Sequence, residues 1–254
     1  MNKICRILLS CLLLVVSQAL FAKDLRVGIA PDAPPLAFHE NGQLSGIEVA
    51  AAESLGKLMA RKIKFVEKPF PELIPALEAG EIDIIMSGMS ITEERAKRIS
   101  FTKPYMDAGQ MAIIRFDDAG KFGFKGAIFR PGMKVAVEDH TTGSSFAESR
   151  LRNAQLTKCS TLAEALDKLK KGEVDFVVHD APTSWGLANN KEMENLMSLN
   201  HAMTEENLAW GIAKNNPELL EAVNQQLVHM QQNGILRAII QKWIPVTIEL
   251  ENKP

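Results

Sequence analysis

Runs of apolar and polar positions divide the first hundred residues into short strands and helices. Residues 25–30 alternate apolar and polar side chains, as a half-buried strand does. Ile47 and Leu55, with small apolar residues between them, share one side of a helix. Pro71 favours a helix start and Gly80 a helix end. The pattern predicts alternating strands and helices at residues 25–30, 46–60, 62–66, 71–79 and 82–86.

The same order of elements returns in the second half of the chain. Residues 133–137 resemble residues 25–29, and a helix at 162–171 again ends at a glycine. The segment 172–178, Gly-Glu-Val-Asp-Phe-Val-Val, then matches Gly-Glu-Ile-Asp-Ile-Ile-Met at 80–86. Helix, glycine and strand is a common succession, but two matched segments in matching order favour a repeat. We therefore expect an α/β fold of two lobes, each a mostly parallel sheet flanked by helices.

The two lobes are predicted to be joined twice. Residues 110–114 leave the first lobe and residues 208–213 return to it, so two strands can act as a hinge. Helices at 217–230 and 235–243 would complete the first lobe. The predicted bounds are 23–110 with 208–254 for lobe 1 and 111–207 for lobe 2.

Polar residues follow the predicted strands of both lobes. Ser87 and Gly88 come after one strand, and His179 and Asp180 end its counterpart. Ligands of open α/β sheets bind beyond the carboxyl ends of the strands. We therefore expect a site between the lobes, completed by the loop 30–36 and by the pair Thr141 and Thr142.

Arg95 follows the strand 82–86 closely. The spacing of Ser90 and Glu93 is that of a capping box, which predicts a helix start just before Arg95. A guanidinium at a helix N-terminus suits a carboxylate. With Asp180 facing it from the other lobe, the cleft would fit a zwitterion. The alternatives are a capped helix with a solvated Arg95, and Asp180 as the N-cap of a helix at Ala181.

The first 22 residues have the pattern of a secretory signal peptide. Lys3 and Arg6 precede an uncharged apolar run at 7–21, and Ala19 and Ala22 offer cleavage points. The run is shorter than the roughly 20 apolar residues of a spanning helix. We expect cleavage and a periplasmic location, with an uncleaved anchor as the minor alternative.

Composition limits the classes of partner and cofactor that the protein can have. The signal peptide holds two of the 29 basic residues and none of the 31 acidic ones, so cleavage leaves a net charge of −4. A mildly acidic surface argues against nucleic acid and anionic membranes as partners. Cys159 alone survives cleavage, so no disulfide can form within the chain. Scattered histidines give no metal motif. We expect a monomer without cofactor or metal.

Five segments together resemble one known family over essentially the whole mature chain. They are residues 73–83, 86–95, 101–105, 177–180 and 234–243. The chain is similar to the periplasmic solute-binding proteins that serve polar amino-acid ABC importers, family 3 of the extracellular solute-binding proteins. The resemblance implies a two-lobed type II periplasmic-binding-protein fold. It also implies capture of an amino acid in the cleft and delivery to an inner-membrane ABC permease, without catalysis.

The resemblance also implies roles for single residues. Arg95 would clamp the ligand α-carboxylate, helped by Ser90 and Thr142. Asp180 would bind the α-ammonium group. Ser87 and the Gly88 backbone would add hydrogen bonds, and Phe70 would form an apolar wall or remain a core residue. The complete predicted set of ligand-binding residues is Arg95, Asp180, Ser90, Thr142, Ser87, Gly88, Phe70 and Thr141.

The chain departs from the family in the loops that contact the ligand side chain. Ala30 and Ala33 stand where many relatives have an aspartate and an aromatic residue, and Asp32 or Phe38 could compensate. His140 replaces a glycine before the paired threonines. Two acidic residues precede it, Glu138 and Asp139, which would favour a cationic side chain if they point inward and are otherwise solvated.

An enzyme is the alternative that remains open. Some relatives on this fold are periplasmic cyclohexadienyl dehydratases, which act on prephenate or arogenate. The resemblance suggests a glutamate shortly after the second-lobe aspartate in those enzymes, whereas Thr183 and Ser184 stand here. The sequence also lacks the motif of a hydrolase nucleophile elbow.

Overall fold

A computed structural model describes residues 23–124, 126–186 and 195–244. The predicted signal peptide at 1–22 lies outside this part of the chain. Within it, no helix is both long and apolar enough to cross a bilayer.

The first of two five-stranded sheets is built mainly from the N-terminal third of the chain. Its strand order is β5 (Ile63–Glu67), β1 (Leu25–Ile29), β6 (Ile84–Ile85), β15 (Gly211–Ala213) and β7 (Ile99–Phe101). Strand β1 is parallel to both neighbours, and β15 is antiparallel to both of its own. The other elements of this part are β2 (Asp32–Ala33), β3 (Ala37–Glu40), β4 (Gln43–Ser45), α2 (Ile47–Leu58), η1 (Phe70–Glu72), α3 (Leu73–Glu78) and α4 (Glu93–Arg98).

The second sheet repeats this arrangement. Its order is β11 (Gln155–Cys159), β10 (Lys134–Glu138), β12 (Phe176–Asp180), β9 (Gln110–Arg115) and β13 (Leu196–Ser198). Strand β10 is parallel to β11 and β12, as β1 is to β5 and β6. The remaining elements here are α5 (Thr142–Arg150), α6 (Leu162–Lys170), α7 (Ala181–Gly186), η2 (Phe116–Phe122) and η3 (Ala127–Phe129). The predicted α/β fold with a repeated sheet is confirmed.

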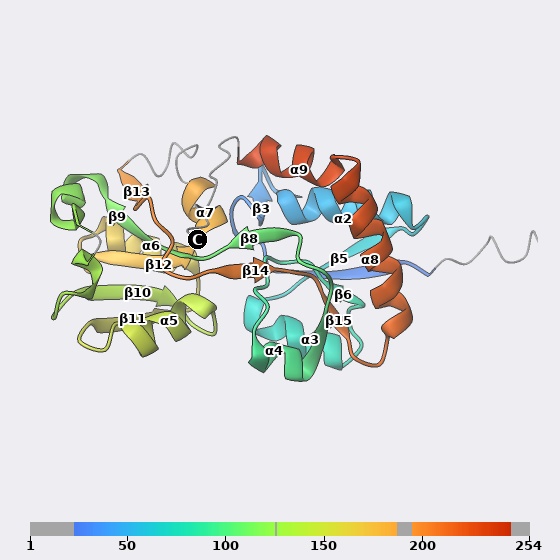
Figure 1. The fold of residues 1–254 in the computed structure, drawn as a ribbon, viewed down its shortest axis with the longest axis horizontal. Coiled ribbons are helices and arrows are strands. Elements are labelled where there is room, and N and C mark those ends of the chain that lie inside the picture. The colour runs from blue at the N-terminus through green and yellow to red at the C-terminus, as the bar shows by residue number, and fades with distance from the viewer. Residues whose placement is uncertain (1–22, 125, 187–194, 245–254) are drawn as a thin grey trace, which may run out of the picture.

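Two antiparallel strands cross between the sheets. Strand β8 (Met106–Ala108) pairs with β14 (Glu206–Leu208), and Figure 1 shows both running from one lobe to the other. They lie slightly upstream of the segments 110–114 and 208–213 that were predicted to cross. Residues 110–115 form β9 instead, because this apolar run is buried between β12 and β13. The bounds of the lobes themselves stay a prediction.

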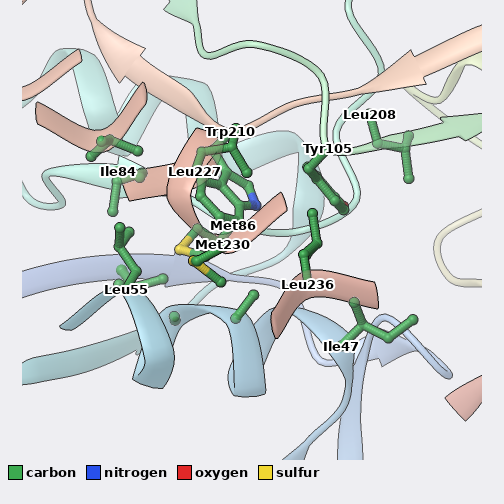
Figure 2. Packing of buried hydrophobic residues seen from close by; sticks show 14 of the residues in the cluster. Ile47, Leu55, Ile84, Met86, Tyr105, Leu208, Trp210, Leu227, Met230 and Leu236 are labelled. Atoms are coloured by element: carbon green, nitrogen blue, oxygen red, sulfur yellow. The ribbon is translucent and has the colours of Figure 1, made fainter. Parts of the chain in front are cut away.

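The core of the first lobe is closed by the end of the chain. Helices α8 (Pro217–Gln232) and α9 (Ile235–Trp243) have the places that the sequence predicts, with Gly234 between them at a left-handed φ of 73°. Their apolar faces pack with α2 around Trp210, which is fully buried (Figure 2). The indole ring stacks on Tyr105 with ring centroids 5.4 Å apart.

We predict that Leu227→Ala lowers the free energy of unfolding by about 2–5 kcal/mol, because Leu227 is fully buried in this core and its removal leaves a cavity. Urea unfolding of the mature protein measures the change. Gln225→Ala, on the exposed side of α8, is the control and should shift stability by less than about 0.5 kcal/mol. Equal losses would contradict the assigned packing of this helix.

Candidate functional site

A cavity lies where the carboxyl ends of the parallel strands of the two sheets face each other. It encloses about 420 Å³, part of it open to solvent. The first lobe lines it with Asp32, Ala33, Leu36, Phe70, Ser87, Gly88, Ser90 and Arg95, and the second with Glu138, Thr141, Thr142, His179 and Asp180. All eight residues that the sequence predicts as ligand-binding are among them.

Arg95 lies in the first turn of α4. The helix begins two residues later than the capping box predicted, because Ser90 is extended and bridges to Leu208 of the returning hinge strand. Thr92 is therefore the N-cap, and its hydroxyl accepts a hydrogen bond from the Arg95 N–H at 3.2 Å. The guanidinium lies over the Phe70 ring, 5.2 Å from its centroid.

The Arg95 guanidinium keeps most of its donors available. It donates to the carbonyl of Ser90 at 3.0 Å and to that of His140, across the cleft, at 3.4 Å. A guanidinium has five N–H donors in a planar fork, so these two contacts leave room for a carboxylate. Burial lowers the pKa of Arg95, and the nearby charges of Asp180 and Glu206 oppose that shift.

Asp180 lies at the end of β12 and faces the hinge. Its carboxylate accepts a hydrogen bond from the side-chain amide of Gln110. The same amide nitrogen lies 3.0 Å from the Thr142 hydroxyl and 3.2 Å from Glu206. Burial and the charge of Glu206 raise the pKa of Asp180, while His179, Gln110 and Arg95 act in the opposite direction.

Glu206 and Gln110 are functional candidates that sequence reasoning missed. Glu206, on β14, accepts hydrogen bonds from the hydroxyls of Thr142 and Thr204, each at 2.8 Å. The Thr142 hydroxyl thus already donates to Glu206 on hinge strand β14. A hydrogen bond from Thr142 to a ligand would therefore come from its backbone N–H, which has no partner within the helix at a helix start. The signal that could have found Glu206 is its place on a strand that crosses the cleft.

The loop after β6 brings Ser87 and Gly88 into the cavity wall. The Ser87 hydroxyl oxygen accepts a hydrogen bond from the Ala30 N–H at 3.0 Å, and the hydroxyl proton remains available. Gly88 has a φ of 62°, and a Cβ there would lie 2.6 Å from Leu36. Its N–H is directed away from the cavity, to Glu48 at 2.5 Å. A ligand contact from Gly88 would therefore use its carbonyl, and not the N–H.

The loop after β10 has an uncommon backbone. Thr141 is the N-cap of α5, since its hydroxyl accepts from the Ser144 N–H at 3.1 Å and donates to the Glu138 carbonyl at 2.7 Å. His140, at the position where the family has a glycine, adopts the left-handed conformation with a φ of 62°. Residues other than glycine rarely adopt this conformation.

The inner end of the cavity is rich in carboxylates. Glu138 is 5% exposed and lies 3.5 Å from the ring of His179, which is 6% exposed. Although burial opposes its charge, the hydrogen bond to Glu138 and the carboxylates around it raise the pKa of His179. Burial and the charge of Glu138 raise the pKa of Asp32, which faces Glu138 from the first lobe.

The other candidates for side-chain recognition lie elsewhere. Asp139 is not among the residues that line this cavity, and its carboxylate pairs with Lys158 at 3.0 Å. Phe38 packs edge-on against Trp243, with ring centroids 5.4 Å apart. Ala30 belongs to the core of the first lobe, whereas Ala33 lines the cavity. Of the two residues proposed to compensate for the missing aspartate and aromatic, Asp32 lines the cavity and Phe38 does not. Of the two acidic residues before His140, Glu138 lines the cavity and Asp139 does not.

Comparison with known proteins places most of the described chain in one family. Residues 25–246 match the bacterial extracellular solute-binding proteins, family 3. A probable histidine-binding protein of Campylobacter jejuni is 29% identical over 221 residues, which cover 86% of this chain and 84% of the relative.

Two solved structures resemble this chain over most of its length. The ancestral amino acid-binding protein described as a precursor of cyclohexadienyl dehydratase is 34% identical with a TM-score of 0.82, over 91% of this chain and 99% of that one. A putative ABC-transporter binding component of Wolinella succinogenes, complexed with lysine, is 28% identical with a TM-score of 0.83, over 91% and 100%. The chain belongs to family 3 of the bacterial extracellular solute-binding proteins.

Proposed function

We propose that this protein captures a free amino acid with a cationic side chain in the cleft between its lobes and delivers it to an inner-membrane ABC permease. The observation that carries the proposal is the presence of Arg95 and Asp180, one from each lobe, in the wall of a single cavity. A fixed cation and a fixed anion in one cleft complement the two charged groups of an amino acid. The names of the similar proteins, which bind histidine or lysine, support the same class.

The α-groups of the ligand would be bound by the polar ends of both lobes. The carboxylate would pair with Arg95 and accept from the Thr142 N–H, with Ser90 beside them. The ammonium group would pair with Asp180 and donate to the Ser87 hydroxyl. Phe70, which stacks on Arg95, would form the wall of this part of the cleft.

The side chain of the ligand would extend toward the carboxylates at the inner end. Three carboxylates, Asp32, Glu138 and Asp180, line the cavity with one guanidinium, that of Arg95, so even a protonated His179 leaves the negative charge in excess. Desolvated carboxylates are stabilised by a cation that reaches them. A ligand with a guanidinium, ammonium or imidazolium group would supply that charge.

Export and delivery complete the proposal. A signal peptide at 1–22 would place a monomeric protein in the periplasm, where closure of the lobes would present the ligand to the permease.

The dehydratase alternative has less support. Thr183 and Ser184, at the position where the resemblance suggests the acid, belong to α7 and are both buried.

Thermal melting of the mature, refolded protein against single amino acids tests the proposed function. A ligand at a thousand times its dissociation constant adds about 4 kcal/mol, or roughly 8–16 °C in Tm for a domain of this size. We expect the largest shifts with L-arginine, L-lysine or L-histidine. A shift with prephenate or arogenate alone would instead favour the dehydratase.

We predict that Arg95→Ala weakens binding by about 2–5 kcal/mol, or roughly 30- to 5,000-fold in Kd, because it removes the partner of a desolvated carboxylate. Titration calorimetry with L-arginine measures the change. Arg98→Ala is the matched control on the same helix, since Arg98 is exposed and pairs with Glu78 outside the cavity. An unchanged affinity in Arg95→Ala would refute the assigned site.

Acidification should weaken binding. Because burial raises the pKa of Asp180, its carboxylate gains a proton at a higher pH than an exposed aspartate, and the ligand ammonium group then loses its counter-ion. The Kd for L-lysine should therefore rise as pH falls from about 7 to about 5. Asp180→Asn should bind weakly at both pH values. A pH dependence that survives in Asp180→Asn would assign the effect to another group.

Selectivity should depend on Asp32 and Glu138. We predict that Asp32→Asn and Glu138→Gln each weaken L-arginine binding by about 1.5–3 kcal/mol, because each removes a charged hydrogen-bond acceptor, and that they reduce its preference over L-glutamine. Competition calorimetry gives both affinities. Asp139→Asn, whose carboxylate pairs outside the cavity, should leave the ratio unchanged. Equal ratios in all three variants would contradict an anionic subsite.

A further inference from the structure

A fully buried carboxylate in the first lobe has no part in the proposed ligand contacts. Glu48, in the first turn of α2, is 0% exposed. Three donors surround it: the Gly88 N–H at 2.5 Å, the Tyr105 hydroxyl at 2.6 Å and the Trp210 indole N–H at 3.0 Å. Among the described residues, no basic side chain pairs with it within 4 Å, so neutral donors alone stabilise this carboxylate.

The three donors come from three separate segments: the loop in the cavity wall and the first-lobe ends of the two hinge strands. Gly88 belongs to the loop 87–90 in the cavity wall. Tyr105 directly precedes β8, and Trp210 follows β14 by two residues, so they mark the first-lobe ends of both hinge strands. Figure 2 shows Tyr105, Trp210 and Leu208 close together above α2.

Backbone contacts join the same three segments. The Tyr105 N–H donates to the Leu208 carbonyl at 3.0 Å, and the Ala209 N–H donates to the Met89 carbonyl at 3.0 Å. Ser90 bridges to Leu208. The Glu48 side chain adds a further link between these segments, through its bonds with Gly88, Tyr105 and Trp210.

A purely space-filling role does not account for a carboxylate here. An apolar side chain of the same size would avoid the cost of burying a charge, but it would leave the three donors without an acceptor. Burial raises the pKa of Glu48, and its hydrogen bonds with Tyr105, Gly88 and Trp210 act against that shift. The carboxylate is therefore suited to bind three separate chain segments at one point.

We infer that Glu48 is a positioning residue that couples the ligand loop 87–90 to the hinge strands β8 and β14. Through this carboxylate, a displacement of the loop on ligand binding is transmitted to both chain crossings, and rotation of the lobes repositions the loop. The coupling does not depend on which ligand binds; its effect on affinity rests on the proposed function.

Hydrogen exchange of the full mature protein tests the coupling without any ligand. Glu48→Gln keeps the shape but turns one acceptor into a donor, so at least one bond is lost. We expect amide exchange in residues 86–90, 104–110 and 206–210 to rise together, at least tenfold. Leu227→Ala is the control: it removes apolar contacts in the same core, and its effect should not be concentrated in those three segments. A rise confined to α2, or one spread evenly over the lobe, would overturn the inference.

Single-donor variants keep the test decisive if Glu48→Gln does not fold. Tyr105→Phe and Trp210→Phe each remove one donor and leave the other two bonds in place. Each should raise exchange in the loop 87–90, which neither residue contacts through a side-chain hydrogen bond, as well as at its own hinge strand. Faster exchange at the mutated strand alone would show a local structural role and refute the coupling.

Affinity for L-arginine gives the second measurement. Glu48→Gln should raise its Kd at least tenfold, mainly through faster dissociation, while Leu227→Ala at matched stability should leave the Kd within threefold. An unchanged Kd in Glu48→Gln would refute the effect on affinity. If the unmodified protein does not bind L-arginine, the proposed ligand class is wrong, and the exchange result still decides whether Glu48 couples loop and hinge.

Discussion

Parallel strands that end at a common edge are the constraint on which this structure depends. Each sheet contains three adjacent parallel strands, β5, β1 and β6 in one and β11, β10 and β12 in the other, so loops and helix starts gather at one end of the sheet. The crossing of β8 and β14 turns these two ends toward each other. Unpaired N–H groups, hydroxyls and charged side chains are therefore concentrated in one cleft, where water is restricted and electrostatic interactions are strong.

The charges in the cleft are not balanced locally. Asp180 is hydrogen-bonded to an amide, and Arg95 donates to backbone carbonyls, so the two groups with the proposed main roles are not paired with each other. The carboxylates of Asp32 and Glu138 come from opposite lobes, with His179 beside them. Closing the lobes brings like charges nearer in a medium of low dielectric. A bound cation would reduce this repulsion and favour closure, so the proposed selectivity and closure would have the same electrostatic origin.

Local patterns predicted the fold and most of the cavity residues, because these features depend on short-range order. The resemblance to the family added Phe70 and the ligand-binding role of Ser90. Strand periodicity, terminal glycines and the matched segments at 80–86 and 172–178 identify the two sheets, and their strand ends identify the cleft. Glu48 and Glu206 could not be found in this way. Each reads as an ordinary polar position of its own element. The partners of Glu48 lie at least 40 residues away in the sequence, and Glu206 reaches Thr142 and Gln110, 64 and 96 residues away. The helix start at Thr92, and not at Ser90, likewise depends on a bridge to distant Leu208.

The contact between Arg95 and His140 connects backbone conformation with closure. The guanidinium reaches the His140 carbonyl across the cleft at 3.4 Å, a long hydrogen bond to a neutral acceptor. The left-handed backbone of His140 places this carbonyl next to the helix start at Thr142, where the proposed ligand carboxylate would also be bound. A carboxylate accepts two parallel bonds from a guanidinium and is a stronger partner than a carbonyl. The Arg95 side chain can therefore bridge the lobes weakly by itself and strongly through a ligand carboxylate. Ligand-driven closure requires that the ligand bind the closed state more tightly than the open state, and this bridge would supply that difference in affinity.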